Sequence, residues 1–91
     1  MAIIWTETAY EDLDRLYAFL AAVNPRAAAE AIEALIAGPE ELLLTPLIGQ
    51  ALPKYLPQHV RRYLVGSYEI RYELVNQDIL VLTIWHQREK R

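Results

Sequence analysis

A histidine stands among cations near the end of the sequence, and these residues are the best suited to chemistry. An apolar run reaches Trp85 and gives way to His86, Gln87 and Arg88. An imidazole can move a proton near neutral pH, and neighbouring arginines can hold a phosphate and stabilise charge on its oxygens. Such a set suffices in principle for metal-free RNA cleavage, in which a ribose 2′-hydroxyl attacks the adjacent phosphate.

The same residues also allow a purely structural interpretation. His86 would then be a strand-terminal residue with a satisfied ring nitrogen, and the cations that follow it would form a solvated tail. Charges at a strand edge also protect a sheet against aggregation. Both interpretations stay open, with His86, Arg88 and Arg61 as candidate catalytic residues and Lys54, Arg62 and Arg71 as candidate target- or RNA-binding residues.

The composition excludes several other kinds of site. The 91 residues include no cysteine, which excludes disulfides and thiolate metal sites and favours a reducing cytosol. The two histidines, His59 and His86, do not have the spacing of a zinc motif. Neither a glycine-rich phosphate loop nor a serine nucleophile motif is visible, so we expect neither a metal nor a cofactor.

The sequence predicts a single cytoplasmic domain over residues 1–91. Its apolar runs fall far short of the roughly 18 residues of a membrane span. The first residues lack the basic and long apolar regions of a signal peptide. No repeat or linker divides the chain.

Charge is divided unevenly along the chain. Within a net charge of −3, residues 1–48 hold two arginines against eight acidic residues, whereas residues 49–91 hold seven Lys and Arg against four acidic residues. A basic half can mark a surface for an anionic partner. The same division would arise simply because helices favour Glu and strand edges favour Arg and Lys.

Two helices are predicted in the first half of the chain. Thr8 and Glu11 have the spacing of a capping box, and apolar residues follow at steps of three and four. Asn24 and Pro25 suit the start of a second, alanine-rich helix, and the short connection predicts an antiparallel hairpin. Gly38-Pro39 should kink or interrupt the second helix, because proline cannot donate to the preceding turn.

The second half changes to a period of two. An irregular loop over residues 49–59 precedes predicted strands at 60–65, 68–75 and 78–85. With a short strand at residues 2–5, the predicted fold class is α+β with the order β-α-α-β-β-β. An antiparallel helical hairpin would pack on one face of a small antiparallel sheet. The opposite face would carry Glu69, Arg71 and Glu73, with Arg61 or Arg62 from the neighbouring strand.

The order of these motifs resembles the RelE/ParE superfamily, which supplies the toxins of type II toxin–antitoxin modules, and it is closer to the ParE-like branch. The resemblance spans nearly the whole chain and rests on IIWTETAYEDLDRLYAFL, NPRAA, TPLIGQ, VRRYLVGSYEIRYELV and ILVLTIWHQR. It implies a toxin that arrests growth when it is not bound by its antitoxin. It also implies a neighbouring antitoxin with a helical and extended acidic tail, which would lie on the basic half and in apolar grooves around the helical hairpin.

Members of this superfamily have different targets. ParE-like members poison DNA gyrase, whereas RelE-like members cut messenger RNA on the ribosome with lysines, arginines and often a carboxy-terminal tyrosine. The single lysine of the loop, Lys54, and the lack of a tyrosine after His86 favour the gyrase branch. Two alternatives stay open: an endoribonuclease, so that enzymatic activity is undecided, and a non-toxic interaction module. The implied partners are the antitoxin and either gyrase or the ribosome with its mRNA, in a homodimer or a heterotetramer with the antitoxin.

Overall fold

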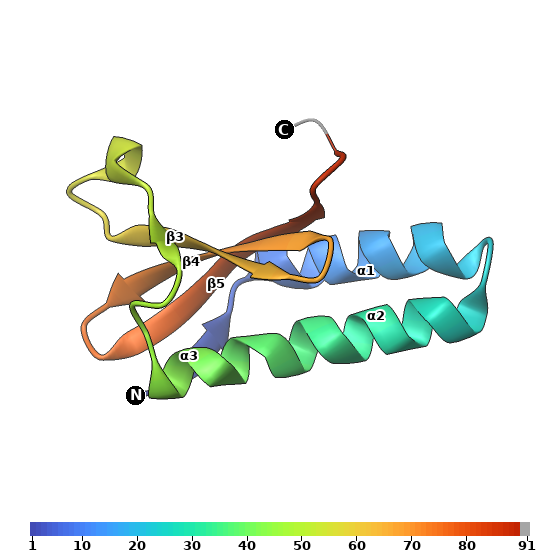
Figure 1. Ribbon diagram of the computed structural model, residues 1–91, viewed down its shortest axis with the longest axis horizontal. Coiled ribbons are helices and arrows are strands. Elements are labelled where there is room, and N and C mark those ends of the chain that lie inside the picture. Colours follow the sequence, from blue (N-terminus) through green and yellow to red (C-terminus); the bar gives the residue numbers. More distant parts are fainter. Residues whose placement is uncertain (90–91) are drawn as a thin grey trace.

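The structure is a computed structural model that describes residues 1–89, and it confirms the predicted α+β class. Two helices, α1 (Glu7–Ala21) and α2 (Pro25–Ala37), form a hairpin that packs against a five-stranded sheet (Figure 1). The strand order is β1-β5-β4-β3-β2; β1 is parallel to β5, and the other pairs are antiparallel. No helix in the described residues is both long and apolar enough to cross a membrane. The strands are β1 (Ile3–Trp5), β2 (Gln50–Ala51), β3 (Val60–Val65), β4 (Tyr68–Val75) and β5 (Asp78–His86).

The two helices begin at polar N-caps, and the N-cap of α1 is not the residue that was predicted. The N-cap of α1 is Thr6, whose Oγ1 accepts a hydrogen bond from the Ala9 amide at 3.2 Å. The prediction of a cap at Thr8 is therefore wrong. The hydroxyl of Thr6 also donates to the Val81 carbonyl at 2.8 Å, so this cap ties the start of α1 to β5. Asn24 caps α2 through the Ala27 amide at 3.2 Å, as predicted.

The predicted interruption of the second helix is confirmed. A 3₁₀ turn, η1 (Gly38–Glu40), follows α2 and leads into the short α3 (Glu41–Leu44). Pro39 has no amide hydrogen to continue the helical pattern. A Cβ atom on Gly38 would lie 2.7 Å from Val65 Cγ2, so glycine allows the end of the helix to approach β3 closely.

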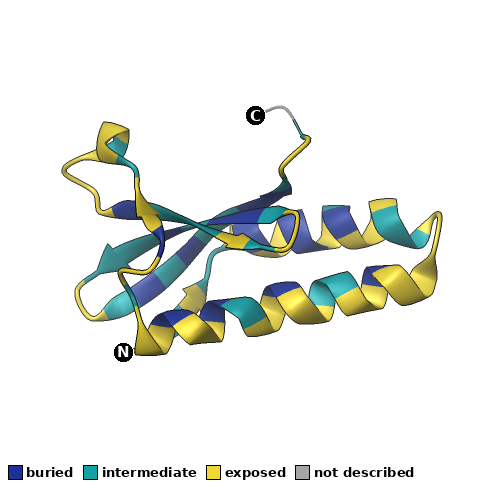
Figure 2. Cartoon of the chain, in the orientation of Figure 1, coloured by how far each residue is buried: buried dark blue, intermediate teal, exposed yellow. Residues whose placement is uncertain are grey.

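The core lies between the helical hairpin and one face of the sheet. Figure 2 shows buried positions on β4 and β5 and exposed positions on the outer side of the hairpin. In β4, the predicted alternation is confirmed because Ile70 and Tyr72 are fully buried in core clusters. The main cluster is made of Ala9, Leu13, Leu16, Leu35, Ile70, Val81 and Ile84.

A β-bulge changes which residues of β5 face the core. Tyr72 pairs with Val81, but the preceding Arg71 pairs with Thr83, so that Leu82 has no partner of its own. The extra residue reverses the alternation beyond it. As a result Val81 and Ile84 both enter the core, although three positions separate them. Trp85, opposite Glu69, is turned toward the other face of the sheet.

Side chains of α1 replace a neighbouring strand along the second half of β5. β1 pairs with β5 only as far as Val81. Beyond it, Asp12 Oδ2 accepts hydrogen bonds from the Ile84 amide at 2.9 Å and the Thr83 hydroxyl at 2.6 Å. Arg15 donates to the Ile84 carbonyl at 3.1 Å. Side chains of α1 therefore form the backbone hydrogen bonds of β5 along the edge where no strand pairs with it.

Tyr72 anchors the segment that leads from the helices to the second half of the sheet. Its hydroxyl donates to the Pro46 carbonyl at 2.7 Å and accepts from the Gly49 amide at 3.0 Å. A Cβ atom on Gly49 would lie 2.6 Å from both Tyr72 Oη and the Arg62 carbonyl. Only glycine fits this approach, which fixes where the loop before β3 begins.

The first prediction concerns the carboxylate of α1. Replacing Asp12 by alanine should lower the free energy of unfolding by about 1–3 kcal/mol, because the buried Ile84 amide loses its acceptor. Urea denaturation of the variant and of Asp14→Ala, an exposed carboxylate on the same helix, measures the difference. Equal stability of the two variants would contradict the role given to Asp12.

The second prediction concerns Tyr72. Phenylalanine at this position leaves the Gly49 amide and the Pro46 carbonyl unpaired and should lower the free energy of unfolding by about 1–3 kcal/mol near neutral pH. Burial raises the pKa of Tyr72 above 10.0, although the Gly49 hydrogen bond and Arg61 act in the opposite direction. Tyr17→Phe, at an exposed position of α1, is the control.

The raised pKa of Tyr72 also predicts how the stability difference between wild type and Tyr72→Phe changes with pH. The folded state keeps Tyr72 protonated, so its stabilisation is complete below the unfolded pKa of 10.0 and is lost as pH rises through the higher folded pKa. The stability difference between wild type and Tyr72→Phe should therefore shrink above pH 10. Chemical denaturation at several alkaline pH values tests this, and a difference that grew with pH would contradict it.

Candidate functional site

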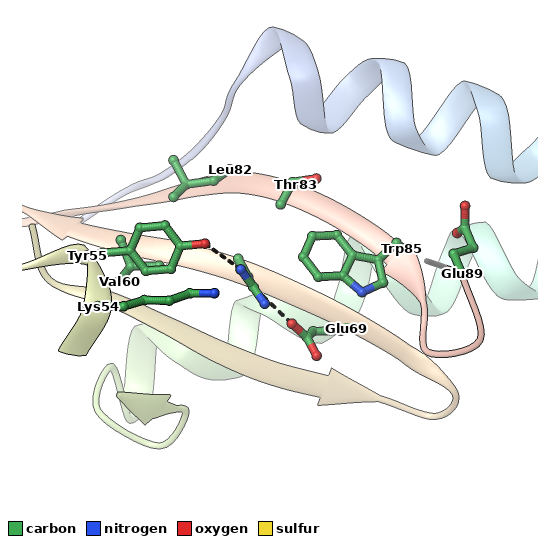
Figure 3. A pocket seen from close by; sticks show the side chains of 9 residues that line it. Lys54, Tyr55, Val60, Glu69, Leu82, Thr83, Trp85 and Glu89 are labelled. Carbon is green, nitrogen blue, oxygen red and sulfur yellow. Dashed lines mark hydrogen bonds and ion pairs between the residues drawn. The ribbon is translucent and has the colours of Figure 1, made fainter. Parts of the chain in front are cut away.

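A groove of about 650 Å³ lies on the sheet face opposite the buried core residues (Figure 3). We call it the open-face groove, and its lining includes Lys54, Tyr55, Glu69, Arg71 and Trp85. Tyr55 and Lys54 come from the 3₁₀ turn η2 (Pro53–Tyr55), and the other three come from β4 and β5. In Figure 3, Lys54 and Tyr55 lie together at one end and Trp85 lies at the other.

Arg71 occupies the centre of this groove and is held on several sides. Its Nε donates to Glu69 Oε2 at 2.9 Å, and Nη1 donates to the Tyr55 hydroxyl. Its guanidinium carbon lies 4.6 Å from the Trp85 ring centroid and 5.7 Å from that of Tyr55. Aromatic faces attract cations, so these contacts fix the guanidinium before any ligand arrives.

Glu69 joins two arginines on the open face. It is only 7% exposed, and its Oε1 pairs with Arg62 Nη2 at 3.0 Å while Oε2 binds Arg71. One carboxylate therefore serves two guanidinium groups. The Lys54 ammonium lies 5.2 Å from the Tyr55 ring centroid and forms no ion pair within residues 1–89. The lining of the open-face groove thus holds two cations, Lys54 and Arg71, beside two carboxylates, Glu69 and Glu89.

His86 lies in a second groove of about 630 Å³, which is mostly apolar. We call it the tail groove, and it is lined by Arg15, Leu16, Phe19, Leu20, Tyr68, His86, Arg88 and Glu89. His86 Nδ1 accepts a hydrogen bond from the Arg88 amide at 3.0 Å. The imidazole meets the Tyr68 ring edge-on, with centroids 5.3 Å apart. Burial, and then the charge of Glu89, raise the pKa of the Tyr68 hydroxyl above 10.0.

Glu89 closes the chain back onto β5 and borders both grooves. Its Oε1 accepts from the His86 amide at 2.8 Å, and Oε2 pairs with Arg15. Residues 86–89 therefore form a turn fixed by α1. The predicted solvated tail also included Lys90 and Arg91, which lie outside the described residues.

The six predicted site residues are distributed over three places. Lys54 and Arg71 share the open-face groove, with Arg62 beside it on Glu69. His86 and Arg88 share the tail groove. Arg61 lies elsewhere, because it pairs in register with the core residue Tyr72 and its guanidinium binds the Leu47 and Gly49 carbonyls at 3.0 and 2.6 Å.

The structure therefore does not bring Arg61 together with His86 and Arg88. Tyr68, the partner of His86 in β4, is four residues from Tyr72, which is about 13 Å along a strand. The expectation that Arg61 or Arg62 would join Arg71 on the open face is met by Arg62 alone. The catalytic and binding roles of all six residues stay predictions.

Two aromatic residues that line the open-face groove, Trp85 and Tyr55, were not among the predicted site residues. Trp85 was interpreted as the end of an apolar run. The bulge that turns it outward has no sequence signal in a strand that is apolar on both faces. Tyr55 falls in a loop without periodicity. Within residues 1–89, no group of three or more His, Cys, Asp and Glu side chains is placed to hold a metal ion.

Comparison with known proteins identifies relatives over nearly the whole chain. The family model of the ParE toxin of the type II toxin–antitoxin system, parDE, matches residues 3–91. A solved structure entitled "Chromosomal ParDE TA system from P. aeruginosa" is similar, with a TM-score of 0.77 and 22% sequence identity over 94% of this chain and 95% of that chain. No curated protein matches the sequence.

A third prediction tests the ion pairs beneath the open-face groove. Glu69→Gln should lower the free energy of unfolding by about 1–3 kcal/mol, because two partly exposed guanidinium groups lose their shared carboxylate. Glu73→Gln, on the same strand, is the control and should have a smaller effect. Urea denaturation compares the two, and an equal or smaller loss for Glu69→Gln would contradict this role.

Proposed function

The chain belongs to the ParE toxin family of type II toxin–antitoxin systems, and from this membership we propose that it arrests growth by poisoning DNA gyrase. The family match over residues 3–91 is the observation that carries this proposal. The chain is the toxin component of its system, and its partner is an antitoxin. We place its action in the cytoplasm, where an unbound toxin can reach gyrase and DNA.

The geometry of the tail groove supports a toxin that acts by binding. Messenger RNA cleavage would need a general base or acid and cations around one phosphate. Arg61 lies on another face and contacts backbone carbonyls. The Nδ1 atom of His86 is occupied by the Arg88 amide, and its ring lies against Tyr68. A gyrase poison needs no such assembly, so this arrangement favours gyrase over the ribosome.

The surface of the hairpin supports an antitoxin that covers apolar groups. Phe19, on α1, is 74% exposed and lines the mostly apolar tail groove together with Leu16 and Leu20. A contiguous exposed apolar patch on a small domain is typical of a protein-binding surface. We propose that a helical part of the antitoxin covers this surface, in a heterotetramer with the antitoxin or around a toxin homodimer.

The fourth prediction separates gyrase poisoning from RNA cleavage. The purified chain should inhibit supercoiling by gyrase and increase the amount of cleaved DNA in the reaction. His86→Asn keeps a hydrogen-bond acceptor for the Arg88 amide but cannot transfer protons, so the variant should still inhibit gyrase. His59→Asn, at an exposed position, is the matched control.

The same variants test the alternative in growing cells. Pulse labelling after induction should show that DNA synthesis falls before protein synthesis. If protein synthesis falls first and His86→Asn slows messenger RNA cleavage by about 10²–10⁴-fold, as expected for loss of an acid–base group, the gyrase proposal is wrong. Unaffected synthesis of both kinds, with soluble protein, would also contradict it.

A further inference from the structure

We propose that the tail groove is a binding site for a small amphipathic carboxylate, a free medium-chain aliphatic acid. Its chain would lie on α1, and its carboxylate would lie at Arg88 and His86. The inference goes beyond the proposed function and does not depend on it. It rests on three features of the groove: an apolar floor, one uncompensated positive charge and an imidazole whose proton is held on one nitrogen.

The apolar floor of the groove comes mainly from one stripe of α1. Leu16, Phe19 and Leu20 all line the groove, and residues three and four positions apart share one face of a helix. The exposed fraction rises from 3% for Leu16 to 74% for Phe19, so Leu16 lies at the bottom and Phe19 at the rim. The ring of Tyr68 adds to the floor from β4. The volume of about 630 Å³ is that of a small-molecule site, in which apolar side chains surround a few polar groups at fixed positions.

The lining of the groove carries an uncompensated positive charge at Arg88. It holds two arginines, Arg15 and Arg88, against one carboxylate, Glu89. Arg15 is paired with Glu89, and also with Asp12, which is buried outside the lining. Arg88 is exposed, and its guanidinium forms neither an ion pair nor a hydrogen bond within residues 1–89. Its donors are therefore available for two parallel hydrogen bonds to one carboxylate.

His86 adds a second free donor beside this charge. Its Nδ1 accepts the Arg88 amide at 3.0 Å, so the proton of the neutral ring lies on Nε2. Nε2 has no hydrogen-bond partner in the described part of the chain. The ring of Tyr68, which meets the imidazole edge-on, limits how the imidazole can turn. An imidazole N–H and a guanidinium both donate, so this end of the groove suits a ligand that offers acceptor oxygens.

The turn that carries these donors is fixed before any ligand arrives. The Gln87 amide donates to the Ser67 carbonyl at 2.9 Å, and the Glu89 amide donates to the His86 carbonyl at 2.9 Å. The Glu89 side chain accepts from the His86 amide at 2.8 Å and is held by Arg15. A site that is already ordered loses little conformational entropy on binding, which favours even a small ligand.

The arrangement matches a molecule with one charged end and an apolar body. Arg15 joins α1 to the turn, and Phe19 and Leu20 lie about one helical turn further along α1. The free donors therefore lie at one end of an apolar surface. A nucleic acid would leave this surface unused and would bring its phosphates near Glu89. A single carboxylate on an aliphatic chain uses both parts of the groove.

The test titrates the full chain with decanoate by isothermal titration calorimetry and follows the backbone amides by NMR. Decanol supplies the chain without the carboxylate, and acetate supplies the carboxylate without the chain. Arg88→Gln is compared with Arg26→Gln, which removes an exposed charge from α2. Phe19→Ser is compared with Val23→Ser, an exposed apolar position outside the lining. All four positions are exposed, and thermal unfolding checks that each variant is folded.

We expect Arg88→Gln to raise the Kd for decanoate by about tenfold, because a hydrogen bond to a charged group is lost. Phe19→Ser should raise it by about fivefold through lost apolar contact, and the two controls should stay within about twofold of wild type. Decanol and acetate should each bind at least about tenfold more weakly than decanoate. The amide shifts should be concentrated in residues 15–20 and 86–89.

Several results would overturn the inference. Equal binding of decanol and decanoate, or an unchanged Kd in Arg88→Gln, would show that the groove only adsorbs apolar chains. An equal loss in Arg26→Gln would indicate a general charge effect, and binding only above the micelle concentration of decanoate would indicate a detergent effect. Binding to phosphatidylglycerol vesicles without binding of free decanoate would assign the groove to a membrane surface instead.

Competition tests the proposed function separately. If the antitoxin helix occupies the tail groove, decanoate should raise the Kd of the antitoxin encoded beside the gene. If decanoate binds as expected and leaves that Kd unchanged, the placement of the antitoxin helix in the proposed function is wrong, while the carboxylate site stands.

Discussion

The hydrogen bonds between Asp12 and the backbone of β5 are the constraint on which both grooves depend. β1 is only three residues long and leaves the second half of β5 without a neighbouring strand on the edge opposite β4. A buried carboxylate on α1, aided by Arg15, takes the place of the missing strand. β5 can therefore run on to Trp85 and His86 in a fixed position. Trp85 then forms part of the wall of the open-face groove, and His86 forms part of the wall of the tail groove.

The bulge at Leu82 decides which groove Trp85 and His86 each enter. With strict alternation from Val81, Thr83 and Trp85 would face the core. The extra residue instead brings Ile84 into the core and places Trp85 beside Arg71. The bulge thus converts a large apolar side chain from a core residue into a platform for a cation. Bulges are frequent next to active sites because the bend that they introduce re-aims a side chain.

The sequence predicted the elements of the fold better than the composition of the site. Periodicity, Asn24-Pro25 and Gly38-Pro39 act locally, so helices, strands and the helix interruption could be derived from them. The two-residue turn after Val65 also sets the register that pairs Arg62 with Arg71. Because side chains alternate between the two faces of a strand, this register alone could have placed Arg61 on the face opposite Arg71. The cap at Thr6 and the position of Trp85 depend instead on contacts with β5 from distant parts of the chain. No local pattern records such contacts.

The distribution of charge gives the molecule two different faces. Seven of the eight acidic residues in the first half are exposed on or beside the helices, and Asp12 is the one that is buried. The strands balance three arginines against Glu69, Glu73 and Asp78, so the excess of Lys and Arg in residues 49–91 lies outside the strands, at Lys54 and after β5. An acidic partner is therefore repelled more strongly by the helical layer than by the sheet, which favours its approach from the open face. A long polyanion would feel both faces at once, whereas a short acidic segment can reach the open face without passing the helices. The net charge of −3 is the sum over both faces, whereas the separation of charge decides from which side a charged partner approaches.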